Sequence, residues 1–296
     1  MTVLEPFAAR LSRGTVIADG AWGTMLFERG LPPGRAPEWW TAERPDVIRA
    51  VAAEYLDAGA EIITTNTFGG SRFRLGPNGL AGRVDEVNRC GVELVREAAA
   101  GRAYVSASIG PSGLLLKPYG DADPDLIRDG FEEQITALAA AGADVFCVET
   151  MTDVREAVLA VTAVRRLVAD ATVIATMTFD VTPRGPFTVM GTSVAQAAAA
   201  LEDAGADLVG ANCGTGVESM REVARAFRTV TRRPLAMRAN AGLPQRRGGR
   251  LVYPDSPSAY AAAAAGMARE AVAVVGGCCG TTPQHIAALR RQLSLA

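Results

Sequence analysis

The sequence predicts an α/β protein that folds as a (β/α)8 barrel, the TIM-barrel architecture, with residues 1–296 in one domain. Three observations support this prediction. A phrase of the form Ala-Gly-Ala-acidic-apolar recurs three times, apolar runs alternate with helical patterns, and 296 residues is a length that such barrels fill as one domain. Hydrophobic residues make up 49% of the chain, which is enough to bury one large core.

The recurring phrase begins at Ala58, Ala141 and Ala204, each time after an Ala-rich helical stretch. Its glycine suits the left-handed residue that ends a helix. The short apolar run that follows suits a strand buried on both faces. The phrase therefore predicts a repeating unit of helix, tight turn and parallel strand.

Eight apolar runs have the length and composition of such buried strands, and helical patterns separate most of them. Eight strand–helix units in succession match the (β/α)8 barrel, in which functional groups lie at the carboxyl ends of the strands. The runs cover residues 15–18, 62–65, 104–109, 145–148, 173–177, 208–211, 235–239 and 272–275.

Polar residues and cysteines follow five of these runs. A buried strand interior would leave such side chains without hydrogen-bond partners, so they are expected to face one common opening. The sequence therefore predicts a site at the mouth of the barrel. The residues are Asp19, Asn66, Thr67, Glu149, Asn212, Cys213, Cys278 and Cys279.

Three of the five cysteines belong to this group: Cys278 and Cys279 are adjacent, and Cys213 ends another strand. Three thiolates predict a Zn²⁺ site whose open fourth position marks it as catalytic rather than structural. The alternative is a set of small buried hydrophobic residues or a strained vicinal disulfide. Cys90 and Cys147 fall inside a helical pattern and a strand, and are predicted to be ordinary core residues.

Composition limits the partners. The formal net charge of −2 gives no basic excess for nucleic acid or an anionic membrane surface, so a small-molecule partner is expected. We find no signal segment and no apolar stretch of about 18 residues. An odd number of cysteines without regular spacing favours a reducing cytoplasm. Homo-oligomer formation stays open.

Five motifs at these strand ends resemble those of the homocysteine S-methyltransferase family, and the resemblance covers essentially the whole chain. Among its members, the chain is most similar to bacterial betaine–homocysteine methyltransferases. Residues 276–288 are also similar to the homocysteine module of cobalamin-dependent methionine synthase. The motifs are DGAWGT from Asp19, TNTFGG from Thr65, VET from Val148, GANCG from Gly210 and GGCCGT from Gly276.

The resemblance implies that Cys213, Cys278 and Cys279 ligate zinc, and that the homocysteine thiol takes the open position and is methylated to methionine. A metal-bound thiol is deprotonated, so attack on a methyl carbon needs no general base. This agrees with the presence of a single histidine. His285 follows Thr282 and Pro283, which predict the start of the last helix, so a structural role is expected for it.

Betaine is the methyl donor that the resemblance favours. The alternatives are S-methylmethionine, another sulfonium or ammonium compound, a methylated corrinoid carried by a separate protein, or a different thiol acceptor. A non-catalytic zinc- or thiol-binding module is a further alternative. The open fourth ligand position and the polar strand ends argue against this last reading.

For the amino-acid end of homocysteine, the resemblance places Asp19 and Glu149 near the ammonium group. The backbone amides around Gly20 and Ala21 are expected to hold the carboxylate. The alternative is that both acids are structural and pair with arginine near the barrel mouth. Asn212, beside a ligand cysteine, is expected to donate to a thiolate.

Aromatic side chains offer faces for a quaternary ammonium donor, namely Trp22, Trp39, Trp40 and Tyr253. Ordinary packing is the alternative for each of them. The arginine-rich segment 246–250 follows the seventh strand and is expected to be a solvated loop on the catalytic side. Clamping of an anionic donor or of a partner protein is the alternative for that segment.

Overall fold

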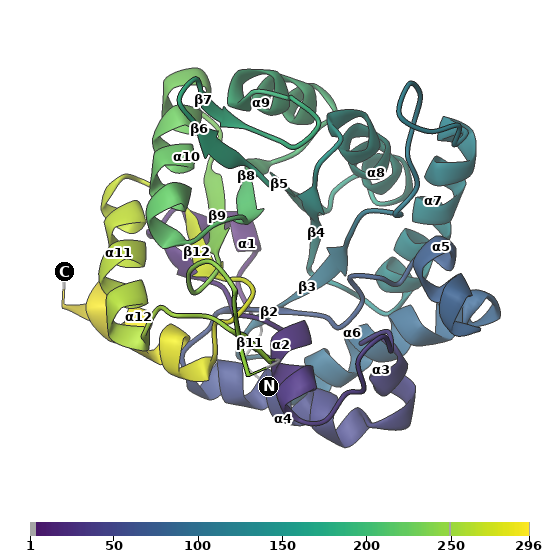
Figure 1. Cartoon of the computed structure of the whole chain (residues 1–296). Coiled ribbons are helices and arrows are strands. Elements are labelled where there is room, and N and C mark those ends of the chain that lie inside the picture. Colours follow the sequence, from purple (N-terminus) through teal and green to yellow (C-terminus); the bar gives the residue numbers. More distant parts are fainter. Residues whose placement is uncertain (1–3, 249, 296) are drawn as a thin grey trace.

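Eight parallel strands form a ring at the centre of the molecule, with helices around it (Figure 1). The computed structural model describes residues 4–248 and 250–295. Each of the eight predicted apolar runs overlaps one strand of the ring. The strands are β1 (Val16–Ile17), β2 (Ile62–Thr64), β3 (Tyr104–Ile109), β4 (Val145–Met151), β5 (Thr172–Met177), β8 (Leu208–Cys213), β9 (Leu235–Ala239) and β12 (Val274–Gly277).

The order of strands in the sheet is β1-β12-β9-β8-β5-β4-β3-β2. The two end strands meet through a parallel bridge between Ala18 and Ile62. The Asp19 amide donates to the Ile62 carbonyl over 3.0 Å, and the Glu61 amide donates to the Ile17 carbonyl over 2.7 Å. These bonds close the sheet on itself, and the predicted (β/α)8 barrel is confirmed.

Three helices of the outer ring, those that precede β2, β4 and β8, end where the repeated phrase predicts. Gly59, Gly142 and Gly205 have φ angles of 95°, 83° and 103°, so each takes the left-handed conformation that ends a helix before the next strand. The helices of this ring are α4 (Pro45–Asp57), α6 (Val84–Ala99), α7 (Pro124–Ala140), α8 (Val154–Leu167), α9 (Val194–Asp203), α10 (Val217–Val230), α11 (Pro257–Arg269) and α12 (Pro283–Ser294).

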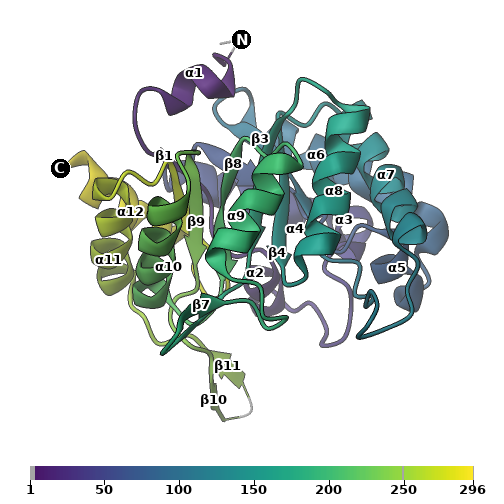
Figure 2. The same ribbon diagram turned by 90° about the horizontal axis from the view of Figure 1, so that it is seen from above.

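Apolar side chains fill the amino end of the barrel. A cluster of buried residues takes at least one side chain from every strand of the ring. Helix α1 (Phe7–Leu11) lies across this end, and Phe7 packs edge-on against Tyr104 with ring centroids 4.9 Å apart. Figure 2 shows α1 on the side of the barrel opposite to the hairpins. The strand members of the cluster are Val16, Ile62, Tyr104, Val145, Cys147, Ile174, Leu208, Ala236 and Val274, and Ala18 directly follows β1.

Short elements and two hairpins surround the carboxyl end. The predicted loop at residues 246–250 is instead an antiparallel hairpin, in which Arg246 pairs with Leu251, and Gly249 lies outside the described residues. The backbone hydrogen bonds of the hairpin give this segment regular structure that its arginines did not predict. These elements are α2 (Gly23–Glu28), α3 (Trp39–Glu43), α5 (Arg72–Leu75), η1 (Gly76–Asn78), η2 (Ala81–Arg83), β6 (Asp180–Thr182), β7 (Gly185–Phe187), β10 (Gln245–Arg247) and β11 (Arg250–Val252).

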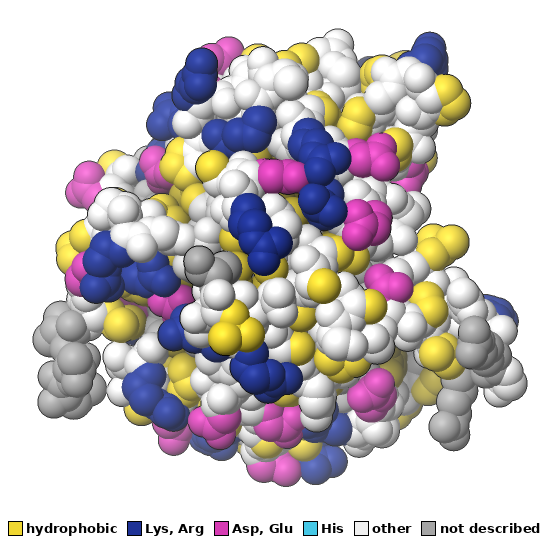
Figure 3. All heavy atoms as spheres, turned by 90° about the vertical axis from the view of Figure 1, so that its left-hand side faces the viewer, with side chains coloured by type: hydrophobic (Ala, Val, Ile, Leu, Met, Phe, Trp, Pro, Cys, Tyr) yellow, Lys and Arg dark blue, Asp and Glu magenta, His cyan; other side chains and the backbone are white. Residues whose placement is uncertain are grey.

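Among the described residues, no helix combines the length and the apolar character needed to cross a membrane. Basic and acidic side chains are interspersed on the face shown in Figure 3. That face therefore carries no uniform basic stripe of the kind that binds nucleic acid.

Candidate metal centre

The three predicted cysteine ligands meet at the carboxyl end of the barrel. Cys213 is the last residue of β8, and Cys278 and Cys279 directly follow β12. The sulfur atoms all lie within 4.8 Å of one another. Strand β9 lies between β8 and β12, and the Cys278 amide donates to the carbonyl of Ala239 at its end over 2.7 Å. Strand pairing thus brings together residues that are more than 60 positions apart in sequence.

The backbone at Cys213 has a conformation that non-glycine residues rarely adopt. Its φ angle is 66°, and φ at Thr150, at the end of β4, is 61°. Such left-handed residues cost free energy and cluster at functional sites, where the surrounding structure holds them in place. The turn at Cys213 ends the strand beside the other two cysteines.

The three thiols differ in proton affinity because they hydrogen-bond to one another. Hydrogen bonds from Cys278 and Cys279 lower the pKa of Cys213 to about 3. The hydrogen bond with Cys213 raises the pKa of Cys278 well above its ordinary value and that of Cys279 to about 11. Without a cation the cluster therefore favours one thiolate shared by two thiols.

A zinc ion fits this donor set. Zinc binds thiolate sulfur at about 2.3 Å, so the sulfurs of a tetrahedral site lie about 3.8 Å apart. The three sulfurs of this cluster, all within 4.8 Å of one another, are compatible with that spacing. A divalent cation would also neutralise the charge that keeps Cys278 and Cys279 protonated. Three protein sulfurs leave a fourth position for a substrate atom.

The amide of Asn212 is held in one orientation next to this cluster. Its Oδ1 accepts hydrogen bonds from the Thr150 amide over 2.7 Å and from the Thr176 hydroxyl over 2.8 Å. Its Nδ2 donates to the Thr150 hydroxyl and lies 3.8 Å from the Cys278 sulfur. The NH₂ group therefore points toward the Cys278 sulfur, the position in which Asn212 is predicted to tune a thiolate.

Two further polar side chains contact the sulfurs. The Tyr253 phenol hydrogen-bonds with Cys279. Tyr253 packs so closely on Gly280 that a Cβ there would lie 2.0 Å from its ring. Asn240 hydrogen-bonds with Cys213 and donates to the Gly214 carbonyl over 2.6 Å. Sequence reasoning missed Asn240, although it follows its strand as a polar residue, just as Asn66 and Asn212 follow theirs.

A buried arginine, also missed from the sequence, crosses the barrel mouth. Arg238 in β9 is 7% exposed, and its Nη2 lies 2.7 Å from Asp19 Oδ1 while its Nη1 lies 3.6 Å from Glu149 Oε2. Burial alone would lower the pKa of Arg238, but the two carboxylates raise it above its ordinary value, so the guanidinium stays charged. In the sequence, the feature that could have identified Arg238 is its charge inside an otherwise apolar strand.

Asp19 is fully buried behind the site. Its carboxylate accepts hydrogen bonds from the Thr64 amide and hydroxyl, from Trp22 Nε1 over 2.9 Å and from Arg238. The arginine pairing that was the alternative for this acid is therefore present. Direct contact of Asp19 with a substrate ammonium stays a prediction.

Glu149 faces a cavity of about 880 Å³ that the three cysteines and Arg238 also line. Its Oε1 accepts a hydrogen bond from the Ser108 hydroxyl, and burial raises its pKa above the ordinary value. A volume in this range is typical of cavities that hold small molecules. Glu149 is thus placed to meet a ligand that also reaches the sulfurs.

The segment after β1 also lines the cavity with Gly20, Ala21 and Trp22. The Ala21 amide already donates to the Thr281 hydroxyl over 3.2 Å, which ties this segment to the cysteine loop. Gly20 is tightly enclosed, since a Cβ there would lie 2.6 Å from that hydroxyl. The roles predicted for this segment toward the substrate carboxylate stay predictions.

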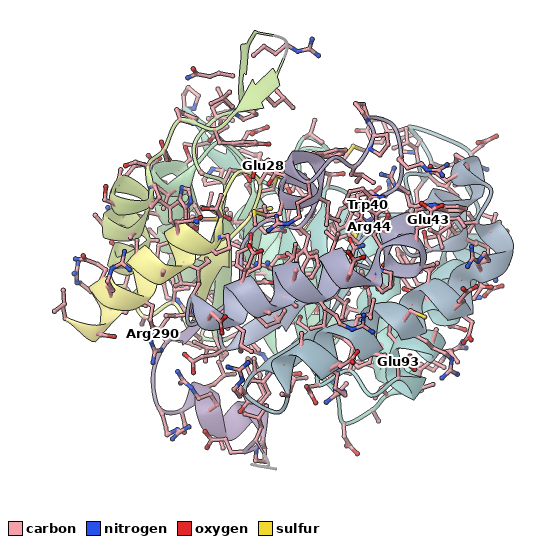
Figure 4. The ribbon with its side chains drawn as sticks, turned by 90° about the horizontal axis from the view of Figure 1, so that it is seen from below. Glu28, Trp40, Glu43, Arg44, Glu93 and Arg290 are labelled. Carbon is pink, nitrogen blue, oxygen red and sulfur yellow. The ribbon has the colours of Figure 1, made fainter. Side chains whose placement is uncertain are left out.

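The other two tryptophans do not line the cavity in the part of the chain that the structure describes. The Arg35 guanidinium lies 4.5 Å from the ring centre of Trp39, and that of Arg44 lies 5.5 Å from the ring centre of Trp40. Figure 4 shows Trp40 and Arg44 among the outer helices. Their aromatic faces thus stack on arginine.

His285 has the structural role predicted for it. It forms a capping box with Thr282 at the start of α12, with Pro283 in the first turn. Its Nε2 lies 3.0 Å from the Asp255 carbonyl, and burial lowers the pKa of the ring. The imidazole is therefore occupied in holding the helix start.

Comparisons with known proteins agree with this geometry. A family model described as homocysteine S-methyltransferase matches residues 16–293. Methionine synthases of Mycobacterium leprae (strain TN) and Mycobacterium tuberculosis (strain ATCC 25618 / H37Rv) are 33% and 34% identical over 96% and 93% of the chain, respectively. The chain spans about a quarter of the length of these curated relatives, 24% in each case.

The metallated form of the homocysteine methyltransferase MmuM from Escherichia coli has the same fold, with a TM-score of 0.82 and 23% identity. The similarity covers 97% of this chain and 100% of that one. Together, the motifs at the strand ends, the family model and the relatives show that the chain belongs to the homocysteine S-methyltransferase family of enzymes.

Proposed function

We propose that the protein, with residues 1–296 as one homocysteine-binding domain, transfers a methyl group to the thiol of homocysteine and forms methionine. Zn²⁺ held by Cys213, Cys278 and Cys279 is the proposed cofactor. The single observation that carries the proposal is that these three sulfurs lie together in the wall of the 880 Å³ cavity. A three-sulfur site that faces a cavity leaves room for a substrate thiol.

When bound, zinc would lower the pKa of the substrate thiol, so that a thiolate is available at neutral pH. The chain itself then needs no general base, and His285 is occupied in a helix cap. Asn212 and Tyr253 support the ligand sulfurs with hydrogen bonds, which disperse negative charge in the cluster.

For the amino-acid end of homocysteine, we propose Glu149 as the acceptor of the ammonium group. Ser108 and Arg238 hold this carboxylate from two sides. Asp19 supports it indirectly, because the Asp19 carboxylate binds the other side of the Arg238 guanidinium. A charge-assisted hydrogen bond from ammonium to Glu149 would orient the substrate with its sulfur toward the cysteines.

Betaine is the methyl donor that we propose, in a cytoplasmic enzyme whose thiols stay reduced. The test is methionine formation by purified, reduced, zinc-loaded protein given homocysteine and either betaine, S-methylmethionine or methylcobalamin. Turnover with betaine alone supports the donor assignment, and turnover with another donor keeps homocysteine methylation but replaces betaine. Bound zinc without homocysteine binding or methionine formation would contradict the proposed function.

A further inference from the structure

A second carboxylate lines the same cavity, and no role in homocysteine binding has been given to it. Glu38 immediately precedes α3 and is 3% exposed. Its Oε1 accepts a hydrogen bond from the Gly69 amide over 2.6 Å. A Cβ at position 69 would lie 3.0 Å from Oε1 and 3.2 Å from Oε2, so the glycine allows this carboxylate to lie flat against the backbone.

Glu38 differs from Glu149 in that none of the described arginines lies within ion-pair distance of its carboxylate. No described lysine or arginine forms an ion pair with its carboxylate, which receives hydrogen bonds only from the amides of Glu38 and Gly69 among the groups that the structure describes. Burial raises its pKa above the ordinary value. A desolvated carboxylate in a cavity wall is costly unless a cation binds next to it.

Arg74 supplies a cation to the cavity wall. It belongs to α5, is exposed, and its guanidinium forms no hydrogen bond or ion pair with any other described group. A Cβ added to Gly113 would lie 3.3 Å from Arg74 Nη1, so the guanidinium rests against the loop that follows β3. Its charge is close enough to Glu38 to counter part of the burial effect on that carboxyl's pKa.

Aromatic side chains accompany this pair of charges. Phe68 and Phe73, next in sequence to Gly69 and Arg74, also line the cavity. Aromatic faces attract methylated cations and provide apolar surface for their methyl groups. This part of the wall therefore combines an anion, a cation and two phenyl rings, which is the recognition chemistry of a small zwitterion with a methylated cationic head.

We infer that Glu38 and Arg74 determine the specificity for the methyl donor: Glu38 attracts its cationic head and Arg74 binds its carboxylate. This inference rests on the proposed function. In the transfer, a bond forms between the homocysteine sulfur and the methyl carbon. The bond from that carbon to the donor nitrogen or sulfur breaks, and its electron pair stays on the donor atom, which becomes neutral.

Because the donor loses its positive charge in this step, Glu38 stabilises the bound donor more than the transition state or the product. Its removal should therefore raise the KM for the donor and leave kcat unchanged or higher. A side chain with only a structural role would give no such separation. Neutralisation of the head would also weaken its attraction to Glu38 and favour product release.

The test compares Glu38→Gln and Arg74→Gln with matched controls. Glutamine keeps the acceptor for the Gly69 amide, so Glu38→Gln should fold with an unchanged Tm or a higher one. The controls are Glu93→Gln, on the outward face of α6 (Figure 4), and Arg72→Gln, whose guanidinium pairs with Glu133 outside the cavity. Both controls should bind donors as the unaltered protein does.

The probes are tetramethylammonium, glycine betaine and S-methylmethionine, titrated calorimetrically into zinc-loaded protein. Glu38→Gln should weaken all three by at least about tenfold, and Arg74→Gln only the two that carry a carboxylate. Unchanged affinities in Glu38→Gln, or no binding of any probe to the unaltered protein, would overturn the inference. Homocysteine is titrated in parallel, because loss of its binding to unaltered protein would contradict the proposed function instead.

Discussion

At the amino end of the barrel the strands contribute Val16, Val145 and Ala236 to an apolar layer that Phe7 covers, whereas at the carboxyl end the same strands lead to Asp19, Glu149 and Arg238. Side chains an even number of residues apart on a strand share a face, so Glu149 points the same way as Val145 and Arg238 the same way as Ala236. Residues near the amino end of a strand thus pack the core, whereas residues near its carboxyl end form the candidate site.

The two ends also differ in what their burial contributes. Burial of apolar surface at the amino end stabilises the fold at about 25 cal/mol per Å². At the carboxyl end, the attraction between buried charges roughly offsets the cost of removing them from water. The carboxyl end therefore contributes reactivity at little net gain in stability. Variants at the two ends should separate activity from the free energy of unfolding.

The largest expected effect is on activity, from Cys279→Ala. Two sulfurs cannot complete a three-ligand zinc site, so zinc retention and methyl transfer should be lost together. Zinc content by mass spectrometry of the native protein and methionine formation measure the two losses. Cys90→Ala, on α6 outside the cluster, is the matched control and should retain both. A fully zinc-loaded and normally active Cys279→Ala protein would show that the metal lies elsewhere.

The next largest expected effect is on stability, and it tests whether the buried charges stabilise one another in the folded protein. Arg238→Met leaves Asp19 and Glu149 buried without their cation, which should lower the free energy of unfolding by about 3–5 kcal/mol. Denaturant unfolding measures the loss. The double variant Arg238→Met with Asp19→Asn should recover part of it. An Arg238→Met protein as stable as the original would mean that the network does not contribute to folding.

How far the sequence predicts this molecule depends on whether a feature is local. The eight strands, the helix-ending glycines and the cap at His285 follow from patterns within a few residues, and the structure confirms them. The sulfur cluster could be inferred because cysteine is scarce and its three members lie at or directly after the ends of two strands.

Features that depend on distant partners were not predicted. Arg238 reads as an odd residue in an apolar run until the fold brings β1 and β4 to it. Glu38 became a cavity residue because Gly69, about 30 positions later, admits its carboxylate. For both residues the sequence shows only a charged side chain, and its partners become visible only in the folded structure.

The substitution Phe7→Ala should destabilise the packing at the amino end of the barrel without affecting the carboxyl end. Phe7 is 5% exposed and packs on Tyr104, so loss of its ring should lower the free energy of unfolding by about 3 kcal/mol. The kcat/KM for methionine formation should stay unchanged at temperatures where the variant is folded. Thermal unfolding and steady-state kinetics measure the two quantities. A fall in kcat/KM that matches the loss of stability would show that the two ends are coupled.

Glu149→Gln should have the smallest effect on stability, with a sign that depends on pH. Burial raises the pKa of Glu149 above 4.5, so the folded protein holds a proton that the unfolded chain releases. The free energy of unfolding then falls as pH rises from about 4.5 to the raised pKa, and levels off above it. Glu149→Gln lacks this fall in the free energy of unfolding, so the variant should be equally stable or more stable than the original protein at neutral pH.

The Glu149→Gln variant should still bind zinc, while its homocysteine affinity drops by about tenfold because an amide replaces a charged acceptor. Calorimetric titration of homocysteine, together with unfolding curves at several pH values, would separate these effects. Loss of zinc with unchanged homocysteine affinity would place the amino-acid pocket elsewhere at the carboxyl end.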